Sequence, residues 1–331
     1  MPHHPRLGIL FSGGLDCMSL AAIANSYIPE GEPIDLFNVA FENPRALKGI
    51  AVTLKNSQQQ KKKKTKLDKK LKYLAKQAGN IPINPNSITE VTEEYQFNIY
   101  DVPDRVTARQ GLQELKTRFP QRPWQLVEID VPYTEAVESK KKVLELASPS
   151  ASVMDLSIAI AFWFAAKGVG RKISITGDVT EMYTSPVKVL FSGLGADEQL
   201  GGYRRHRGSY ESNGWQGLVD ELQLDVDRIA TRNLGRDDRV ISDHAKEVRF
   251  PFLDEKVIDF LSSLPCFVKS NPTVKEGLGD KILLRSLALD DRLGPLTLTA
   301  KEPKRAIQFG ARTAKMHDKK EKGDDLADNS D

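Results

Sequence analysis

Apolar and polar residues follow one another along the first 200 residues in a pattern that predicts strands followed by helices. Short apolar runs, of about four to eight residues and bounded by turn residues, are typical of buried strands. The runs that fit are Leu7–Phe11, Ile34–Phe41, Trp124–Val131 and Val187–Phe191. Because strands that alternate with helices favour parallel pairing, the pattern predicts an α/β fold with a doubly wound parallel sheet.

The segments between these runs carry apolar residues at helical spacing. The predicted helices are Leu15–Tyr27, Arg105–Phe119, Thr134–Leu146 and Val153–Lys167. The last of them is apolar on all sides, which indicates a buried helix. After Trp215 the pattern turns mainly helical, so we expect a helical C-terminal part.

Two segments do not fit a packed core. Residues from about 44 to 98 contain ten lysines between Lys55 and Lys76, including the run Lys61–Lys64. This composition predicts a solvated, disordered insertion, and a contact patch for RNA or for nuclear import is the sharper alternative. The charged tail, residues 313–331, is also expected to be disordered. The chain is therefore interpreted as one domain, 1–312, with an insertion and a tail.

Composition narrows the class of protein. The net charge is only +3, which predicts no general attraction to nucleic acid or membrane. The only cysteines are Cys17 and Cys266, too few for a disulfide framework or a cysteine-rich zinc site. The longest apolar stretch, Ile158–Ala166, is too short to span a bilayer. With no secretory signal recognised, we expect a cytoplasmic enzyme.

Two glycine-rich loops carry the candidate chemistry. Phe11–Cys17 reads Phe-Ser-Gly-Gly-Leu-Asp-Cys and follows the first strand, and Ser192–Glu198 reads Ser-Gly-Leu-Gly-Ala-Asp-Glu and follows the fourth. Glycines let a backbone turn sharply and point N–H groups at an anion, and an acid can hold the Mg²⁺ that neutralises a polyphosphate. Two such loops at strand ends predict an ATP site at the mouth of the sheet.

The first loop is not a Walker motif, because no Gly-x-x-x-x-Gly-Lys-Ser/Thr occurs in the chain. Its Ser-Gly-Gly-x-Asp pattern is similar to the pyrophosphate loop of enzymes that split ATP between its α and β phosphates. The residues of the two loops predicted to bind nucleotide are Phe11, Ser12, Gly13, Gly14, Asp16, Cys17, Ser192, Gly193 and Gly195. Asp16 and Asp197 are the predicted metal ligands, and a plain strand-to-helix turn is the alternative.

The chain resembles the asparagine synthetase family, in its C-terminal, synthetase half. The resemblance is carried by both loops and by Val102–Thr107, Asn233–Val240, Arg249–Asp254 and Lys304–Gly310. It implies a sheet sandwich of the adenine-nucleotide hydrolase-like, ATP pyrophosphatase type. It also implies a ligase reaction of asparagine biosynthesis, in which Mg-ATP adenylates aspartate, pyrophosphate leaves, and ammonia displaces AMP.

The resemblance also assigns roles to single residues. Val39, at the end of the second strand, lies where the family contacts adenine, and Asp155 opens the helix that flanks the nucleotide. Lys301 or Lys304 resembles the lysine that stabilises charge during adenylation, and the sequence does not choose between them. For Arg204–His206, phosphate contact and a solvated helix face stay open as alternatives.

Three departures from the family put turnover in question. Leu194 stands where active synthetases carry a glutamate that is expected to activate ammonia, and leucine cannot accept a proton. Cys17 replaces the usual serine of the first loop, and a thiol is a weak donor. The glutaminase half of these amidotransferases, whose cysteine would follow Met1, is not found, since residue 2 is Pro2. We therefore expect ATP, aspartate and ammonia as small-molecule substrates, with ammonia supplied by a separate partner.

Two other classes of function stay open. One is a catalytically inactive nucleotide-binding protein, which Leu194 and Cys17 favour. The other is an RNA-modifying ATP pyrophosphatase, which only the lysine run favours.

Overall fold

The structure is a computed structural model that describes residues 4–45, 98–173, 179–314, 316 and 325–327. The chain divides into two units, one formed by residues 1–42 with 100–331 and the other by residues 43–99. All elements given below belong to the first unit. The lysine-rich insertion predicted for 44–98 lies almost wholly outside the described residues, as does most of the tail. Their predicted disorder therefore stays a prediction.

A mostly parallel, seven-stranded sheet forms the centre of the first unit, in the order β5-β4-β3-β2-β1-β6-β7. The strands are β1 Leu7–Leu10, β2 Ile34–Phe41, β3 Trp124–Val131, β4 Val169–Ile173, β5 Val179–Thr184, β6 Val189–Phe191 and β7 Glu247–Arg249. β1 lies between β2 and β6 and is parallel to both. The predicted α/β class and parallel pairing are confirmed, and the strand order is Rossmann-like.

One edge of the sheet differs from the predicted parallel arrangement. β4 pairs antiparallel with β3, and β5 pairs antiparallel with β4. A Cβ at Gly170 would lie 2.5 Å from the carbonyl oxygen of Glu128, so only glycine lets β4 approach β3 this closely. β4 carries charged residues and is only partly buried, so it lacks the apolar run by which the other strands are recognised.

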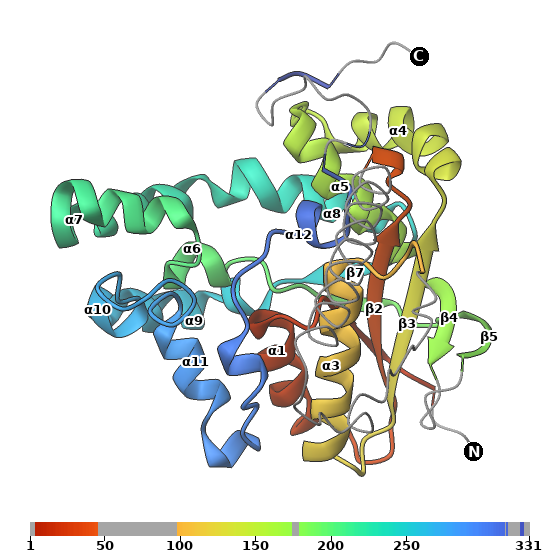
Figure 1. Ribbon diagram of the computed structural model, residues 1–331, viewed down its shortest axis with the longest axis horizontal. Helices are drawn as coiled ribbons and strands as arrows, with labels where there is room; N and C mark the ends of the chain where they lie inside the picture. Colours follow the sequence, from red (N-terminus) through yellow and green to blue (C-terminus); the bar gives the residue numbers. More distant parts are fainter. Residues whose placement is uncertain (1–3, 46–97, 174–178, 315, 317–324, 328–331) are drawn as a thin grey trace, which may run out of the picture. The chain divides into compact units, whose positions relative to one another are not determined.

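Helices cover both faces of the sheet (Figure 1). Apolar residues of α1 (Leu15–Asn25) and α3 (Pro103–Arg118) pack on one face. The other face is covered by α4 (Tyr133–Ala147), α5 (Val153–Lys167) and α8 (Gly235–Ser242). The predicted buried helix over Val153–Lys167 is confirmed, with its N-terminus capped by Ser152 and its end at Gly168 in the left-handed region.

The C-terminal part is mainly helical, as the sequence predicts. Its remaining helices are α6 Ala196–Leu200, α7 Arg204–Ile229, π-helical η1 Ala230–Leu234, 3₁₀-helical η2 Pro251–Leu253, α9 Glu255–Ser263, α10 Cys266–Lys269, α11 Ile282–Ala288, 3₁₀-helical η3 Asp291–Leu293 and η4 Thr299–Lys301, and α12 Ile307–Gly310. None of the helices in the described ranges combines the length and the apolar character needed to cross a bilayer.

Candidate active site

A cleft of about 310 Å³ is lined by both glycine-rich loops. The loops follow β1 and β6, and the sheet order reverses at β1, because β2 and β3 lie on one side of it and β6 and β7 on the other. Ligands of open α/β sheets bind at such a switch point, outside the carboxyl ends of the strands. The predicted site residues that line the cleft are Phe11, Ser12, Gly14, Asp16, Cys17, Val39, Ser192, Gly193, Asp197 and Lys304.

Gly13 lies behind the first loop instead of lining the cleft. Its φ is +76°, and a Cβ there would lie 2.3 Å from the carbonyl oxygen of Thr107 in α3. The glycine therefore supplies both the left-handed turn and the close approach of loop and helix. α1 begins directly after Gly14. Since glycine has no side chain that could cap the helix, the first backbone amides of α1 are open to an anion.

Cys17 is held as a thiol. Its Sγ donates to the carbonyl oxygen of Gly14 at 3.2 Å, and burial raises its pKa to about 11. Because the thiolate is the nucleophilic form, this environment favours a structural role for Cys17 in the loop.

The second loop is built in a similar way. Gly195 has a φ of +97°, and a Cβ at this position would lie 2.4 Å from Leu253. The amide of Gly195 donates to Oε2 of Glu198 at 3.1 Å, while the hydroxyl of Tyr203 donates to Oε1 of the same carboxylate at 2.6 Å. Leu194, which replaces the family's glutamate, is half-buried and lines the cleft.

The two predicted metal ligands lie on either side of one lysine, Lys281. Its Nζ lies 2.7 Å from Oδ1 and 2.9 Å from Oδ2 of Asp16, and 2.9 Å from Oδ1 of Asp197. Oδ2 of Asp197 pairs with Nζ of Lys304 at 3.0 Å. Burial opposes ionisation of Asp197, but the two lysines outweigh it and hold its pKa below the usual range. Among the described residues, Asp16 pairs only with Lys281, which it shares with Asp197, so the effect of burial prevails and the pKa of Asp16 is raised.

The structure separates the two lysines between which the sequence could not choose. Lys304 lines the cleft and lies 4.6 Å from the ring centroid of Tyr203. Lys301 ends η4, is exposed and does not line the cleft. Their different positions make Lys304 the better candidate for a group that meets a bound nucleotide.

Lys281 and Arg285 were missed by the sequence analysis. Lys281 precedes α11 and Arg285 follows one helical turn later, so both reach the cleft from the same side. Nη1 and Nε of Arg285 donate to backbone carbonyls, but its Nη2 is buried without a hydrogen-bond partner among the described residues. An unpartnered guanidinium N–H beside the cleft fits a phosphate oxygen. The only sequence signal for these two residues is that both are basic and lie within six positions after Gly279.

A basic wall comes from the helical segment 204–242. The residues of this segment that line the cleft are Arg205, Asp225, Arg228, Ile229, Arg232, Asn233, Arg236 and Asp237. Asp225 is buried and pairs with Arg205, with Arg228 and with His206, whose Nε2 lies 2.8 Å away. His206 is buried, whereas Arg204 is exposed and does not line the cleft.

Asp155, at the start of α5, also lines the cleft and pairs with Arg236 of the basic wall at 2.5 Å. Arg236 also contacts Asp237 at 2.8 Å. Burial raises the pKa of Asp237 to about 6 in spite of this arginine. These ion pairs connect α5 to α8 along the cleft.

An apolar wall lies on the sheet side of the cleft. It is formed by side chains from the ends of β1 and β2 and from α5, namely Leu10, Phe37, Val39, Ile158, Phe162 and Ala165. The cleft therefore combines an apolar wall, suited to a flat base, with a charged region suited to phosphates.

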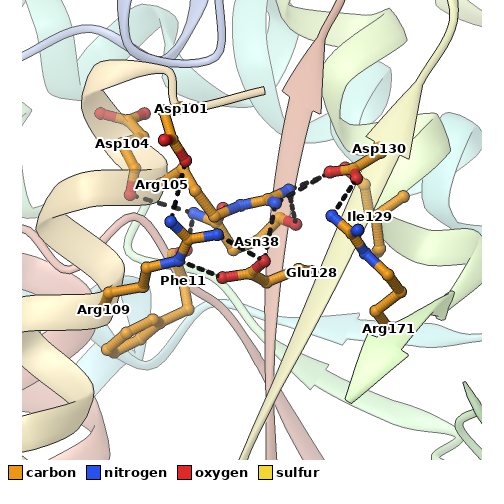
Figure 2. A network of polar contacts seen from close by, with 10 residues as sticks. All are labelled: Phe11, Asn38, Asp101, Asp104, Arg105, Arg109, Glu128, Ile129, Asp130 and Arg171. Atoms are coloured by element: carbon orange, nitrogen blue, oxygen red, sulfur yellow. Dashed lines mark hydrogen bonds and ion pairs between the residues drawn. The ribbon is translucent and has the colours of Figure 1, made fainter. Parts of the chain in front are cut away.

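A largely buried polar network lies next to the first loop (Figure 2). The guanidinium of Arg105, fully buried in α3, donates to Oδ1 of Asn38 at 2.6 Å, to Glu128 at 3.0 Å and to Asp130 at 2.8 Å. Nδ2 of Asn38 donates in turn to the carbonyl oxygen of Phe11 at 2.9 Å. The network thus connects the start of α3 and the ends of β2 and β3 to the first loop.

The acidic side chains of the cleft fit the Mg²⁺ that the family resemblance implies only in part. No cluster of three or more metal-ligating side chains occurs within the part of the chain that the structure describes. Mg²⁺, however, is commonly bound through one or two carboxylates together with substrate phosphates. Asp16 and Asp197 share one ammonium and line one cleft, so they fit a phosphate-borne Mg²⁺, provided that Lys281 gives way.

Comparisons with known proteins show what the chain is similar to. Residues 208–321 match the family model described as asparagine synthase. The chain is 43% identical over 321 residues to asparagine synthetase domain-containing protein 1 of Mus musculus, covering 97% of this chain and 48% of that protein. For the Gallus gallus protein of the same name, identity is 41% over 324 residues, covering 97% and 48%.

A similar protein of Drosophila melanogaster, also described as asparagine synthetase domain-containing, is 34% identical over 333 residues, which cover 98% of this chain and 47% of that protein. The chain therefore spans about half the length of the curated relatives that it matches.

Proposed function

We infer that the chain contains an asparagine synthase domain, because residues 208–321 match that family model and nearly the whole chain is related to the asparagine synthetase domain-containing proteins. From this premise we propose that it binds Mg-ATP in the described cleft and adenylates the side-chain carboxylate of aspartate for amidation, in an ATP pyrophosphatase-type domain of a cytoplasmic protein. The observation that carries the proposal is the gathering of Asp16, Asp197, Lys281 and Lys304 between the two loops.

Each part of the cleft has a place in this reaction. The apolar wall beside Val39 would hold the adenine, and the open amides at the start of α1 would hold the pyrophosphate that leaves. Mg²⁺, held by Asp16 and Asp197 together with the phosphates, would neutralise charge on that leaving group. Nη2 of Arg285 would donate to a phosphate oxygen.

Lys304 is the residue that we assign to charge stabilisation during adenylation. It projects from the segment after η4 into the cleft and contacts only one oxygen of Asp197, so its remaining N–H groups are available to a ligand. Removing a preorganised donor of this kind typically costs about 10²- to 10³-fold in rate.

Aspartate-dependent exchange of labelled pyrophosphate into ATP tests the proposal. This assay reports adenylation alone and needs neither ammonia nor a glutaminase. The native chain should catalyse exchange, Asp16→Ala should abolish it, and Lys304→Ala should lower it about 10²-fold or more. Loss of exchange in Lys301→Ala, with exchange kept in Lys304→Ala, would reverse the assignment of the lysine.

Leu194 favours one alternative, a catalytically inactive domain that binds nucleotide. A half-buried leucine faces the cleft where the family has a proton acceptor. A native chain that binds Mg-ATP by calorimetry, yet shows no aspartate-dependent exchange, would support this alternative. A chain that does not bind Mg-ATP at all would contradict both.

A further inference from the structure

Lys281 occupies the position that the metal-binding proposal assigns to a divalent cation. Its side chain is 3% exposed, and its Nζ lies 2.7–2.9 Å from three carboxylate oxygens of Asp16 and Asp197. Lys304 takes the fourth oxygen, Oδ2 of Asp197, at 3.0 Å. Every oxygen of the acid pair is therefore already paired with an ammonium group.

The backbone holds Lys281 in this position against its local preference. Its φ of 52° and ψ of 37° lie in the left-handed region, which residues with a Cβ avoid. The amide of Lys281 donates to the carbonyl oxygen of Leu200 at 3.0 Å, and its carbonyl accepts from the amide of Arg285 at 2.9 Å. Strain that surrounding structure maintains at a cleft is a reason to look for function.

A divalent cation can join the two acids only by displacing the ammonium of Lys281. Two like-charged groups cannot share the same carboxylate oxygens at these distances, and the displaced ammonium is costly to bury without an anionic partner. A polyphosphate beside the acids would offer such a partner, because Lys281 lines the same cleft. Metal binding and phosphate binding should therefore be coupled.

We propose that Lys281 is a tethered cation that excludes free divalent metal from Asp16 and Asp197 until a polyphosphate enters the cleft and receives the displaced ammonium. The inference rests on the proposed function only in taking these two acids as the metal-binding pair. It makes Lys281 a positioning residue that lets the site accept a metal–nucleotide complex but not the metal alone.

Mn²⁺ titration of the full chain, followed by the paramagnetic resonance signal of the free ion and without nucleotide, tests the proposal. The native chain should show no tight Mn²⁺ binding that depends on Asp16, so Asp16→Asn should leave its Mn²⁺ titration unchanged. Lys281→Met removes the ammonium, keeps an unbranched apolar chain, and should tighten Mn²⁺ binding by about tenfold or more, since binding no longer competes with an ion pair. Lys304→Met, which frees one oxygen only, should tighten it much less.

The outcomes separate this inference from the proposed function, because no ATP is turned over. Tight, Asp16-dependent Mn²⁺ binding by the native chain would overturn it. The inference would also be overturned if the Lys281→Met variant folds but binds Mn²⁺ no more tightly than the native chain. The same holds if its gain in Mn²⁺ affinity persists when Asp16→Asn is added to that variant. If Lys281→Met unfolds without metal and folds with Mn²⁺, the exchange of one cation for another is supported. Unfolding that Mn²⁺ does not reverse counts against it.

Discussion

Replacing Arg105 by methionine should destabilise the protein more than any comparable change on the surface of α3. Five contacts of the guanidinium would be lost, three to side chains and two to the carbonyl oxygens of Asn38 and Ile129. Methionine fills most of the same space but cannot donate. The acceptors left behind on Asn38, Glu128 and Ile129 are buried, so water cannot readily replace the lost donor there, whereas Asp130 is partly exposed (Figure 2).

The structure limits how large the loss can be. Both oxygens of Glu128 keep the guanidinium of Arg109, at 2.6 and 2.8 Å, and Asp130 keeps Arg171, so neither acid becomes unpaired. Breaking a buried ion pair typically costs about 3 to 5 kcal/mol when the partner is left alone. With the acids still paired, the cost should fall towards the lower limit, about 3 kcal/mol, most of it from orphaned acceptors at roughly 1 to 3 kcal/mol each.

Thermal unfolding followed by circular dichroism measures this cost. The midpoint of Arg105→Met should fall by roughly 6 to 12 °C, at about 2 to 4 °C per kcal/mol. Arg118→Met is the matched control, because Arg118 ends the same helix and is exposed; its midpoint should change by less than about 2 °C. Equal shifts in the two variants would refute the reasoning, because they would show that the buried network contributes no more than a surface arginine.

Two further predictions concern groups that line the cleft. Burial raises the pKa of Asp104 from 3.8 to about 7 despite Arg305, so the folded protein retains a proton that the unfolded chain releases as the pH rises above about 4. Stability should therefore fall between about pH 4 and pH 7 by up to roughly 4 kcal/mol, and denaturant unfolding of Asp104→Asn should lack this fall; an unchanged pH slope would exclude the group as its source. Leu194→Glu should raise ammonia-dependent asparagine formation about tenfold or more with unchanged ATP affinity, because a general base acts in the transition state. A stable variant with no gain in product would exclude the missing carboxylate as the only lesion.

The elements that the sequence predicts well are those whose burial is complete. Ile34–Phe41 and Trp124–Val131 have the predicted bounds because each is rich in large apolar residues and largely buried between helices on both faces of the sheet. Val153–Lys167 also has its predicted bounds, since Ser152 and Gly168 mark its two ends locally. β4, β5 and β7 were missed because their residues are polar or few, and pairing with a neighbouring strand, a non-local interaction, is what makes them strands.

The same distinction applies to the candidate site, where Asp16, Asp197 and, as one of two alternatives, Lys304 were predicted, whereas Lys281 and Arg285 were not. Asp16 and Asp197 follow strands, and the carboxyl ends of parallel strands meet at one edge, so a local motif is enough to bring them together. Lys281 itself has left-handed backbone angles and directly precedes the short helix α11. No local sequence pattern specifies that its side chain reaches the two acids. Because the charge of the acid pair depends on this lysine, the affinity of the pair for a metal is set by tertiary packing. A sequence motif for two acids therefore predicts where a metal could bind, whereas in our proposal Lys281 determines when it does.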